Sequence, residues 1–254
     1  MSTYDLISDG KFRYIDSQGD GPTLMLLHGL FGALSNFEGI IQGFGESYRV
    51  VVPMLPIYEL SIRKTGIGGL RDYVAEFVKH MQLDQLNLLG NSLGGHIAQI
   101  YTLDHPDRVN SITLTGSSGL FESAMGSGFP KRGDREYIRN KVGNVFYDPA
   151  TANEALVDEV FDITTNREKA LRVVMTAKSA VRHNLTDKLH QLTQPVLLVW
   201  GKQDEVTPPF VAEKFHELLP DSRLVWVDKC GHAPMMEHPE QFNQILREFL
   251  AEVA

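Results

Sequence analysis

The stretch that decides the fold is Leu86-Asn87-Leu88-Leu89-Gly90-Asn91-Ser92-Leu93-Gly94, in the first half of a 254-residue chain. Its first residues have the apolar character of a buried strand, and the residues after Ser92 have the spacing of a helix. A strand that turns sharply into a helix exposes its corner residue. Glycines two residues before and after Ser92 remove the Cβ atoms that would collide at so tight a corner. The pattern predicts a G-x-S-x-G nucleophile elbow, the alternative being an ordinary Gly-Ser loop.

Strand and helix patterns alternate on both sides of this elbow. Apolar runs predict strands at residues 11–15, 23–28, 49–53, 109–115, 195–201 and 222–227, in addition to the one that begins at residue 86. Amphipathic spacing predicts helices at 34–42, 69–81, 95–101, 208–219 and 239–253. This alternation favours an α/β fold with a mostly parallel sheet and helices on both faces. The loops at the carboxyl ends of the strands are then expected to hold the site.

The alternation is interrupted between about Ser118 and Asp187. Helices are predicted there at 134–145, 152–161 and 166–183, with no strand between them. We therefore expect residues 118–187 to form a helical lid and residues 1–117 and 188–254 to form the core. Apolar side chains of this insertion are expected either to line a pocket or only to pack the insertion against the core, namely Leu120, Phe121, Met125, Phe129, Phe146, Tyr147, Phe161 and Met175.

Composition restricts the class of protein. Hydrophobic residues make up 43% and charged residues 22% of the chain, as in ordinary globular proteins. A formal net charge of -8 disfavours nucleic acid and anionic membranes as partners, because both require a basic surface. The N-terminal residues have neither a basic start nor an apolar core, so we expect no export, and no run is long and apolar enough to span a membrane. With one cysteine, Cys230, no internal disulfide can form. We expect a cytoplasmic protein that acts on a small molecule; composition does not indicate the oligomeric state.

Two later loops contain the residues that a serine nucleophile requires. A serine hydroxyl attacks well only when a base accepts its proton and a carboxylate orients that base. Asp204 and His232 each follow one of the last two predicted strands. Parallel strands would place both at the same sheet edge as Ser92, in the chain order serine, acid, histidine. We predict Ser92 as nucleophile, His232 as general base and then acid, and Asp204 as the orienting carboxylate. The alternatives are Glu205 as the acid and a purely structural hydrogen bond for His232.

The oxyanion of a tetrahedral intermediate needs main-chain donors. The N-H of Leu93, at the positive end of the helix after the elbow, is predicted to supply one. The second is expected from the loop after the first parallel strand, with Leu30 as the leading candidate and Phe31 as the alternative.

Other reactive side chains are assigned structural parts. His28 is expected to brace the glycine loop that follows it, His96 to pack within its helix, and Cys230 to pack beside the His232 loop. No H-E-x-x-H or C-x-x-C motif indicates a metal site, and no G-x-G-x-x-G follows the first strands. The sequence therefore predicts neither a metal nor a nucleotide cofactor.

Along nearly its whole length the chain resembles the α/β-hydrolase superfamily. The resemblance rests on four motifs, which are His28-Gly29, Gly90-x-Ser92-x-Gly94, Asp204 and Gly231-His232. It implies a mostly parallel eight-stranded sheet with a helical lid inserted after the sixth strand. Because the nucleophile position holds Ser92 and not aspartate, it does not imply a haloalkane dehalogenase or an epoxide hydrolase.

Among the serine branches, Asn91 and the run 116–120 are similar to carbon-carbon hydrolases of ring-fission products. The loop 29–32 has fewer glycines than in those enzymes, and Ala233 stands where they usually have tryptophan. A resemblance to carboxylesterases therefore leads. Residues 53–59 read Pro-Met-Leu-Pro-Ile-Tyr-Glu where relatives usually have an aspartate and glycines. We expect a bulkier loop there, narrowing the pocket.

The leading hypothesis is a cofactor-free serine hydrolase that cleaves a small or medium acyl ester through an acyl-enzyme. The first alternative is a carbon-carbon hydrolase or lactonase, in which Lys131, Arg132 or Arg182 of the lid binds a substrate carboxylate. The second alternative is a ligand sensor that keeps the triad but turns over slowly.

Overall fold

A single sheet runs through the computed structural model, which describes residues 4–32, 37–121, 131 and 133–253. The eight strands found in these residues are paired in the order β1-β2-β4-β3-β5-β6-β7-β8. Only the pairs β1-β2 and β2-β4 are antiparallel, and the other pairs are parallel. The bounds are β1 (Ile7–Asp9), β2 (Phe12–Asp16), β3 (Thr23–Leu27), β4 (Arg49–Pro53), β5 (Leu86–Asn91), β6 (Val109–Thr115), β7 (Val196–Gly201) and β8 (Ser222–Val227). The predicted α/β-hydrolase sheet is thus confirmed, and β1 is a strand that the sequence pattern did not indicate.

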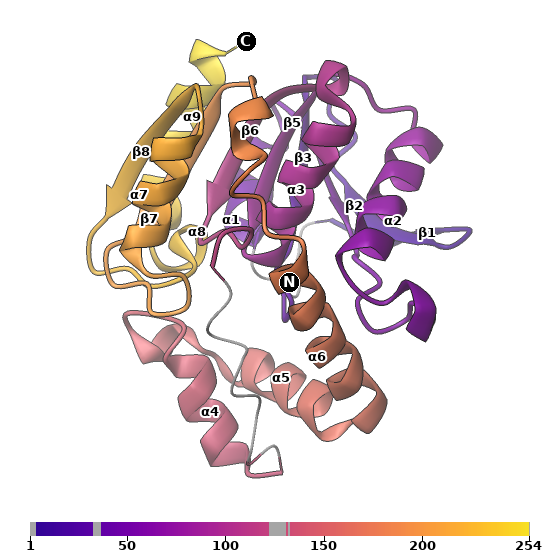
Figure 1. Ribbon diagram of the computed structural model, residues 1–254, viewed down its shortest axis with the longest axis vertical. Coiled ribbons are helices and arrows are strands. Elements are labelled where there is room, and N and C mark those ends of the chain that lie inside the picture. Colours follow the sequence, from indigo (N-terminus) through magenta and orange to yellow (C-terminus); the bar gives the residue numbers. More distant parts are fainter. Residues whose placement is uncertain (1–3, 33–36, 122–130, 132, 254) are drawn as a thin grey trace.

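Helices cover both faces of this sheet, as Figure 1 shows. Their bounds are α1 (Glu38–Phe44), α2 (Ile67–His80), α3 (Leu93–Asp104), α7 (Pro209–Leu218), α8 (Pro234–Glu237) and α9 (Pro239–Glu252). Short 3-10 helices lie at Ile62–Lys64, Pro106–Arg108, Pro149–Thr151 and Leu189–Gln191. The predicted start of α1 at residue 34 falls outside the described residues.

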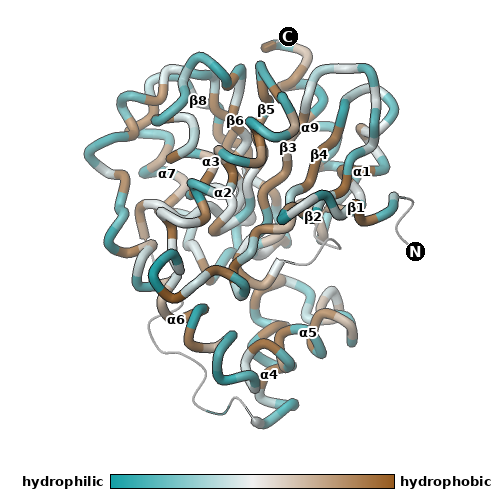
Figure 2. The backbone as a smooth tube through the Cα atoms, turned by 90° about the vertical axis from the view of Figure 1, so that its right-hand side faces the viewer, coloured by the Kyte–Doolittle hydropathy of each residue, from teal (hydrophilic) through white to brown (hydrophobic). Residues whose placement is uncertain are grey.

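The alternation of side chains along the strands builds two core layers. In β3, Met25 and Leu27 pack in one hydrophobic cluster with residues of α2, α3 and α7. Leu24 and Leu26 point the other way and pack with residues of α1 and α9. Because both faces are buried, the strand reads as an uninterrupted apolar run in the sequence. The hydropathy view in Figure 2 shows the same concentration of apolar residues along the central strands.

Among the described residues between β6 and β7, the α-helices are α4 (Arg135–Gly143), α5 (Glu154–Thr165) and α6 (Arg167–Arg182), together called the insertion helices. Each begins at a capping side chain. Asp134 accepts a hydrogen bond from the Tyr137 N-H, Asn153 from Leu156, and Asn166 from Glu168 and Lys169. Figures 1 and 2 both show the insertion helices at one end of the molecule, below the sheet.

A buried histidine ties the end of α6 to the core. His96 on α3 is fully buried, and its Nε2 lies 2.9 Å from the carbonyl oxygen of His183, the residue after α6. Burial lowers the pKa of His96 to about 4, so the ring is neutral and Nε2 acts as the donor to that carbonyl. His96 is therefore the packed helix residue that was expected, and it also anchors the insertion.

Candidate active site

Ser92 occupies the corner between β5 and α3 in a strained conformation. Its φ is 54° and its ψ is -119°, in a region that side-chain-bearing residues seldom adopt. A Cβ on Gly94 would lie 1.9 Å from the Leu27 carbonyl oxygen, and a Cβ on Gly90 would lie 2.4 Å from the Gly95 nitrogen. Both glycines are therefore required by close backbone approach, which is the local geometry that the G-x-S-x-G pattern predicts.

The loop after β7 presents Asp204 to His232. The Nδ1 atom of His232 lies 2.9 Å from Oδ2 of Asp204, and both side chains are buried. The other carboxylate oxygen, Oδ1, accepts hydrogen bonds from the main-chain N-H groups of Val206 at 2.8 Å and Thr207 at 2.9 Å. The Thr207 hydroxyl donates to Oδ2 at 2.8 Å. With three further donors on it, the Asp204 carboxylate has a fixed orientation and acts as the acceptor for the imidazole.

Glu205, the alternative acid, has a different position. It is exposed and is among the residues that line the cavity. Its neighbour Asp204 nevertheless holds the hydrogen bond to His232.

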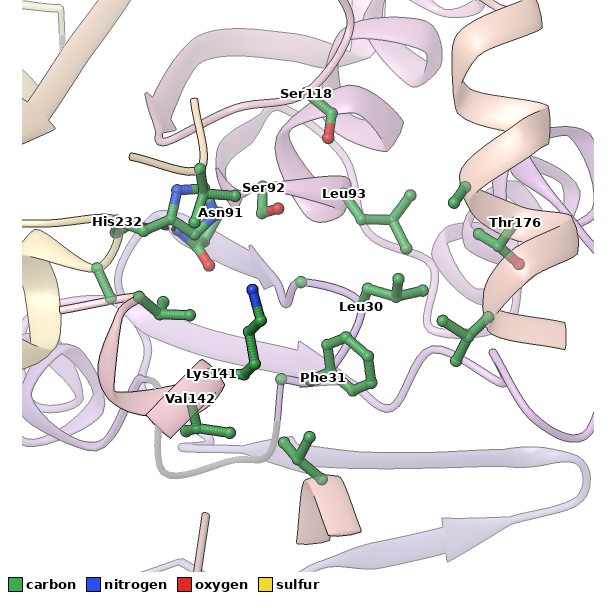
Figure 3. A pocket seen from close by; sticks show the side chains of 18 of the residues that line it. Leu30, Phe31, Asn91, Ser92, Leu93, Ser118, Lys141, Val142, Thr176 and His232 are labelled. Atoms are coloured by element: carbon green, nitrogen blue, oxygen red, sulfur yellow. Dashed lines mark hydrogen bonds between the residues drawn. The ribbon is translucent and has the colours of Figure 1, made fainter. Parts of the chain in front are cut away.

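Ser92 and His232 line the same cavity, and Figure 3 shows the Ser92 side chain with its hydroxyl turned away from the imidazole of His232. Within the described residues, no hydrogen bond joins the Ser92 hydroxyl to His232. In enzymes without substrate, such bonds are often long and tighten only in the complex. Rotation of the serine side chain about a single bond changes the direction of its hydroxyl without moving the backbone.

The main chain of His232 is anchored from two sides. Its N-H donates to the Val145 carbonyl at 2.8 Å, just after α4, and its carbonyl accepts from the Asn91 side chain at 3.2 Å. The preceding N-H of Gly231 donates to Glu237 at 2.7 Å. Sequence reasoning singled out Asn91 only for its resemblance to other hydrolases and missed Glu237. The position of Glu237 on α8, shortly after His232, was the only local sign that it contacts the His232 loop.

The loop after β3 approaches the elbow closely. Leu30 lines the cavity, and a Cβ on Gly29 would lie 3.3 Å from the Cβ of Ser92. The Gly29 carbonyl accepts from the Gly32 N-H at 3.0 Å and from Nδ1 of His28 at 2.9 Å. The Nε2 atom of His28 in turn accepts from the Leu55 N-H at 3.0 Å. Burial lowers the pKa of His28, consistent with a neutral ring that donates at Nδ1 and accepts at Nε2. His28 thus braces the loop as expected.

The cavity has a volume of about 800 Å³ and lies between the carboxyl ends of the strands and the insertion helices. Val142 of α4, Leu156 of α5 and Val173 of α6 give it apolar walls. Of the apolar residues predicted to line it, Phe121 and Phe146 do so, Met125 and Phe129 lie outside the described residues, and Leu120, Tyr147, Phe161 and Met175 are not among its lining residues.

The cations at the cavity differ from those expected. Lys131 and Arg182 are exposed and do not line it, and Arg132 lies outside the described residues. Lys141 and Arg167 line it instead, and Figure 3 shows the Lys141 side chain extending into the cavity. Lys141 directly precedes the buried Val142 on α4. The sequence did not indicate which side of this helix faces the cavity.

Cys230 is fully buried, and burial raises the pKa of its thiol, so it packs under the His232 loop as expected. In the part of the chain that the structure describes, no cluster of three or more His, Cys, Asp or Glu side chains could hold a metal ion. Across the same residues, none of the helices has the length and apolar character needed to cross a bilayer.

Comparison with known proteins identifies the family. A family model described as alpha/beta hydrolase fold matches residues 22–155 and 164–239. The chain belongs to the alpha/beta hydrolase family. The matched residues include the elbow, Asp204 and His232, and the sheet order agrees with this assignment.

Relatives within the family include two kinds of hydrolase. The chain is 27% identical to a 2-hydroxy-6-oxononadienedioate/2-hydroxy-6-oxononatrienedioate hydrolase of Paraburkholderia phymatum, covering 95% of this chain and 91% of the relative. It is also 27% identical to a pimeloyl-[acyl-carrier protein] methyl ester esterase of Nitrosomonas europaea, covering 90% and 96%. The crystal structure of MGS-MChE2, an alpha/beta hydrolase enzyme from a lagoon-sediment metagenome, superposes with a TM-score of 0.81 at 42% identity over 98% of both chains. The protein is accordingly a hydrolase.

Proposed function

We propose that this hydrolase cleaves small or medium acyl esters through an acyl-enzyme, with Ser92 as nucleophile, His232 as base and Asp204 as the orienting acid. One observation carries the proposal. The imidazole that is hydrogen-bonded to Asp204 at 2.9 Å lines the same cavity as the serine at the strained elbow. A donor at Nδ1 leaves Nε2 as the proton acceptor, which is the tautomer that a general base needs.

The reaction proceeds in two halves. His232 accepts the Ser92 proton as the serine oxygen bonds to the ester carbonyl carbon, and the carbonyl π electrons move to its oxygen. The N-H groups of Leu93 and Leu30 stabilise this oxyanion, helped by the positive end of α3. Collapse of the intermediate breaks the bond to the alcohol, which takes the proton from His232. Water then attacks the acyl-enzyme with the same base, releasing the acid and restoring Ser92.

The shape of the cavity supports the substrate class. A volume of about 800 Å³ with mainly apolar walls suits a small molecule with an acyl chain of modest length. The Nitrosomonas relative, named as a methyl ester esterase, supports an ester as the cleaved group. Residues 118–187, which include the insertion helices, are proposed as a lid that supplies one wall and so sets acyl length.

A panel of p-nitrophenyl esters of increasing acyl length tests this proposal. We expect the native protein to hydrolyse the short esters and Ser92→Ala to lose at least about three orders of magnitude in kcat. A fluorophosphonate should add one label, located on Ser92 by mass spectrometry. Cys230→Ser is the matched control, because it removes the only thiol, and should retain both activity and labelling. Equal rates from the native protein and Ser92→Ala would exclude this mechanism.

Carbon-carbon hydrolysis is the second candidate, and Lys141 favours it. This cation lines the cavity and makes no ion pair with any described residue, so it is placed to receive a substrate carboxylate. The Paraburkholderia relative is named as a hydrolase of a dioate. Turnover of a 2-hydroxy-6-oxo-dienoate exceeding that of every ester would replace the ester proposal. In that case Lys141→Gln should lower kcat/KM for the dienoate, whereas Lys131→Gln, outside the cavity, should not.

A further inference from the structure

Tyr58, in the loop after β4, contacts the loop after β3. The latter, residues 29–32, is called the oxyanion loop because it holds the proposed donor Leu30. The Tyr58 hydroxyl donates to the carbonyl oxygen of Leu30 at 2.5 Å. The side chain is partly buried and lies in the segment 53–59, for which a bulky loop was expected. This contact joins residues 28 positions apart and involves none of Ser92, Asp204 and His232.

Fixing a carbonyl also fixes the next N-H, because a trans peptide unit is planar with its C=O and N-H pointing in opposite directions. The Gly29 carbonyl is held by His28 and the Gly32 N-H, which sets the direction of the Leu30 N-H. The Leu30 carbonyl is held by Tyr58, which sets the direction of the Phe31 N-H. The two peptide planes that flank Leu30 are then both held, so that neither the Leu30 N-H nor the Phe31 N-H can turn freely. Each peptide unit that offers a candidate oxyanion donor therefore has its own partner.

We propose that Tyr58 is a positioning residue that holds the Leu30–Phe31 part of the oxyanion loop in its working conformation. This inference rests on the proposed ester hydrolysis. Glycines at 29 and 32 flank the loop and give its backbone a wide choice of conformations. Oxyanion donors contribute to catalysis in so far as they already point at the developing charge and need no reorganisation. The hydrogen bond from Tyr58 to Leu30, which lies between the two glycines in the chain, restricts that freedom.

The loop after β4, which contains Tyr58, also contacts the insertion helices. Arg172 of α6 donates through Nε to the carbonyl of Leu60 at 3.1 Å. The Lys169 ammonium, from the first turn of α6, lies 5.9 Å from the centre of the Tyr58 ring. Tyr58 thus contacts both the Leu30 carbonyl and the first turn of α6.

Tyr58 remains a donor throughout the pH range in which the enzyme would be assayed. Burial, and to a smaller extent the negative charges of Glu159 and Glu59, raise the pKa of the phenol above its ordinary value of 10.0. The hydroxyl proton is therefore retained up to at least pH 10.0. Any alkaline loss of activity should have the same midpoint in the native protein and in a variant without this hydroxyl.

The test is Tyr58→Phe, which removes one hydroxyl and keeps the ring. We expect kcat for a short p-nitrophenyl ester to fall about tenfold, the equivalent of one hydrogen bond of about 1.4 kcal/mol, while KM changes less than about twofold. The inhibition constant of a trifluoromethyl ketone, which forms an oxyanion with the nucleophile, should rise by the same factor as kcat falls. Active-site titration with a fluorophosphonate corrects both values for misfolded protein.

Tyr73→Phe is the matched control, because Tyr73 is a buried tyrosine on α2 outside the cavity. It should retain native kcat and native ketone affinity. Native ketone affinity in Tyr58→Phe would overturn the proposal, as would a loss confined to KM. Failure of the proposed function is distinguishable, because the native enzyme itself would then be insensitive to both the ketone and the fluorophosphonate.

Discussion

The main-chain N-H of His232 donates to the carbonyl of Val145 at 2.8 Å. This bond joins the loop of the proposed base directly to the residues that follow α4. The approach is so close that a Cβ on Gly231 would lie 2.5 Å from the same carbonyl oxygen. The Glu237 carboxylate adds a bridge, accepting from Gly231 at 2.7 Å and from Tyr147 at 2.7 Å. The position of the imidazole therefore depends on the insertion as well as on Asp204.

Replacing Glu237 should loosen this bridge. Glu237→Gln keeps one amide oxygen but loses the second acceptor, so we expect kcat for ester hydrolysis to fall about fivefold to tenfold, corresponding to about 1 kcal/mol. KM should change little, because the side chain is not in the cavity lining. Glu240→Gln, an exposed neighbour on α9, is the control and should have native kinetics. Identical kinetics in the two variants would show that the bridge does not position His232.

The two adjacent acids near His232 should differ sharply in their effect. Asp204→Asn removes the acceptor for Nδ1 and favours the wrong tautomer, for which a loss of about four orders of magnitude in kcat is expected. Glu205→Gln should change kcat less than about threefold, because Asp204 holds the bond to the imidazole. Both are measured with a saturating short ester. A larger loss in Glu205→Gln would reverse the assignment.

His96 should make stability depend on pH. Its pKa is about 4 in the folded protein because of burial, whereas an exposed histidine has an ordinary pKa of 6.5. Between these values the unfolded chain binds a proton that the folded chain does not, so the free energy of unfolding falls as the pH drops below 6.5. From pH 7.5 to pH 5 this residue should account for about 2 kcal/mol.

Urea unfolding at the two pH values measures the contribution of His96. His96→Gln keeps a donor for the His183 carbonyl and should reduce the pH dependence by about 2 kcal/mol. The exposed His190 provides the control, since His190→Gln should leave the dependence unchanged. An unaltered slope in His96→Gln would contradict the assignment of a buried neutral ring.

Substitution by alanine should have opposite effects at a glycine in close backbone contact and at one with open space around it. A Cβ at Gly94 would lie 1.9 Å from the Leu27 carbonyl oxygen, so Gly94→Ala forces the elbow away from β3 and should cost at least about 3 kcal/mol of stability. A Cβ at Gly68, in the first turn of α2, meets nothing within 4 Å. Gly68→Ala should stabilise by about 0.5 kcal/mol. Thermal and urea unfolding of both variants check the prediction, and equal changes in the two would contradict it.

Sequence reasoning predicted the parts of the fold that have local signals. The strand 109–115 was predicted with the bounds of β6, and α6 was predicted to within a residue at each end, because Asn166 is a capping residue before an amphipathic run. The edge strand β1 was missed since it has only three residues and no apolar pattern. Gln18, Gln82, Gln85 and Lys229 adopt positive φ at turns, with no glycine to indicate it.

The residues of the candidate site also differ in how far the sequence could predict them. Ser92, Asp204 and His232 were placed by a rule of topology, because residues after parallel strands meet at one edge. Sequence reasoning did not identify Lys141 and Arg167 as the cations at the cavity. Which side chain of a loop or helix faces a cavity depends on the rotation of that element against its neighbours, and the chain carries no local signal for rotation.

Glycine spacing and strand alternation act over a few residues, so they predicted a strained serine between strand and helix and the chain order of its proposed partners. The bonds that support the site could not be predicted in this way, such as Tyr147 to Glu237, 90 residues apart, and Tyr58 to Leu30. Such bonds form between groups whose distance is set by the packing of whole helices on the sheet. Their residue types are ordinary in the sequence, and their significance comes from packing alone.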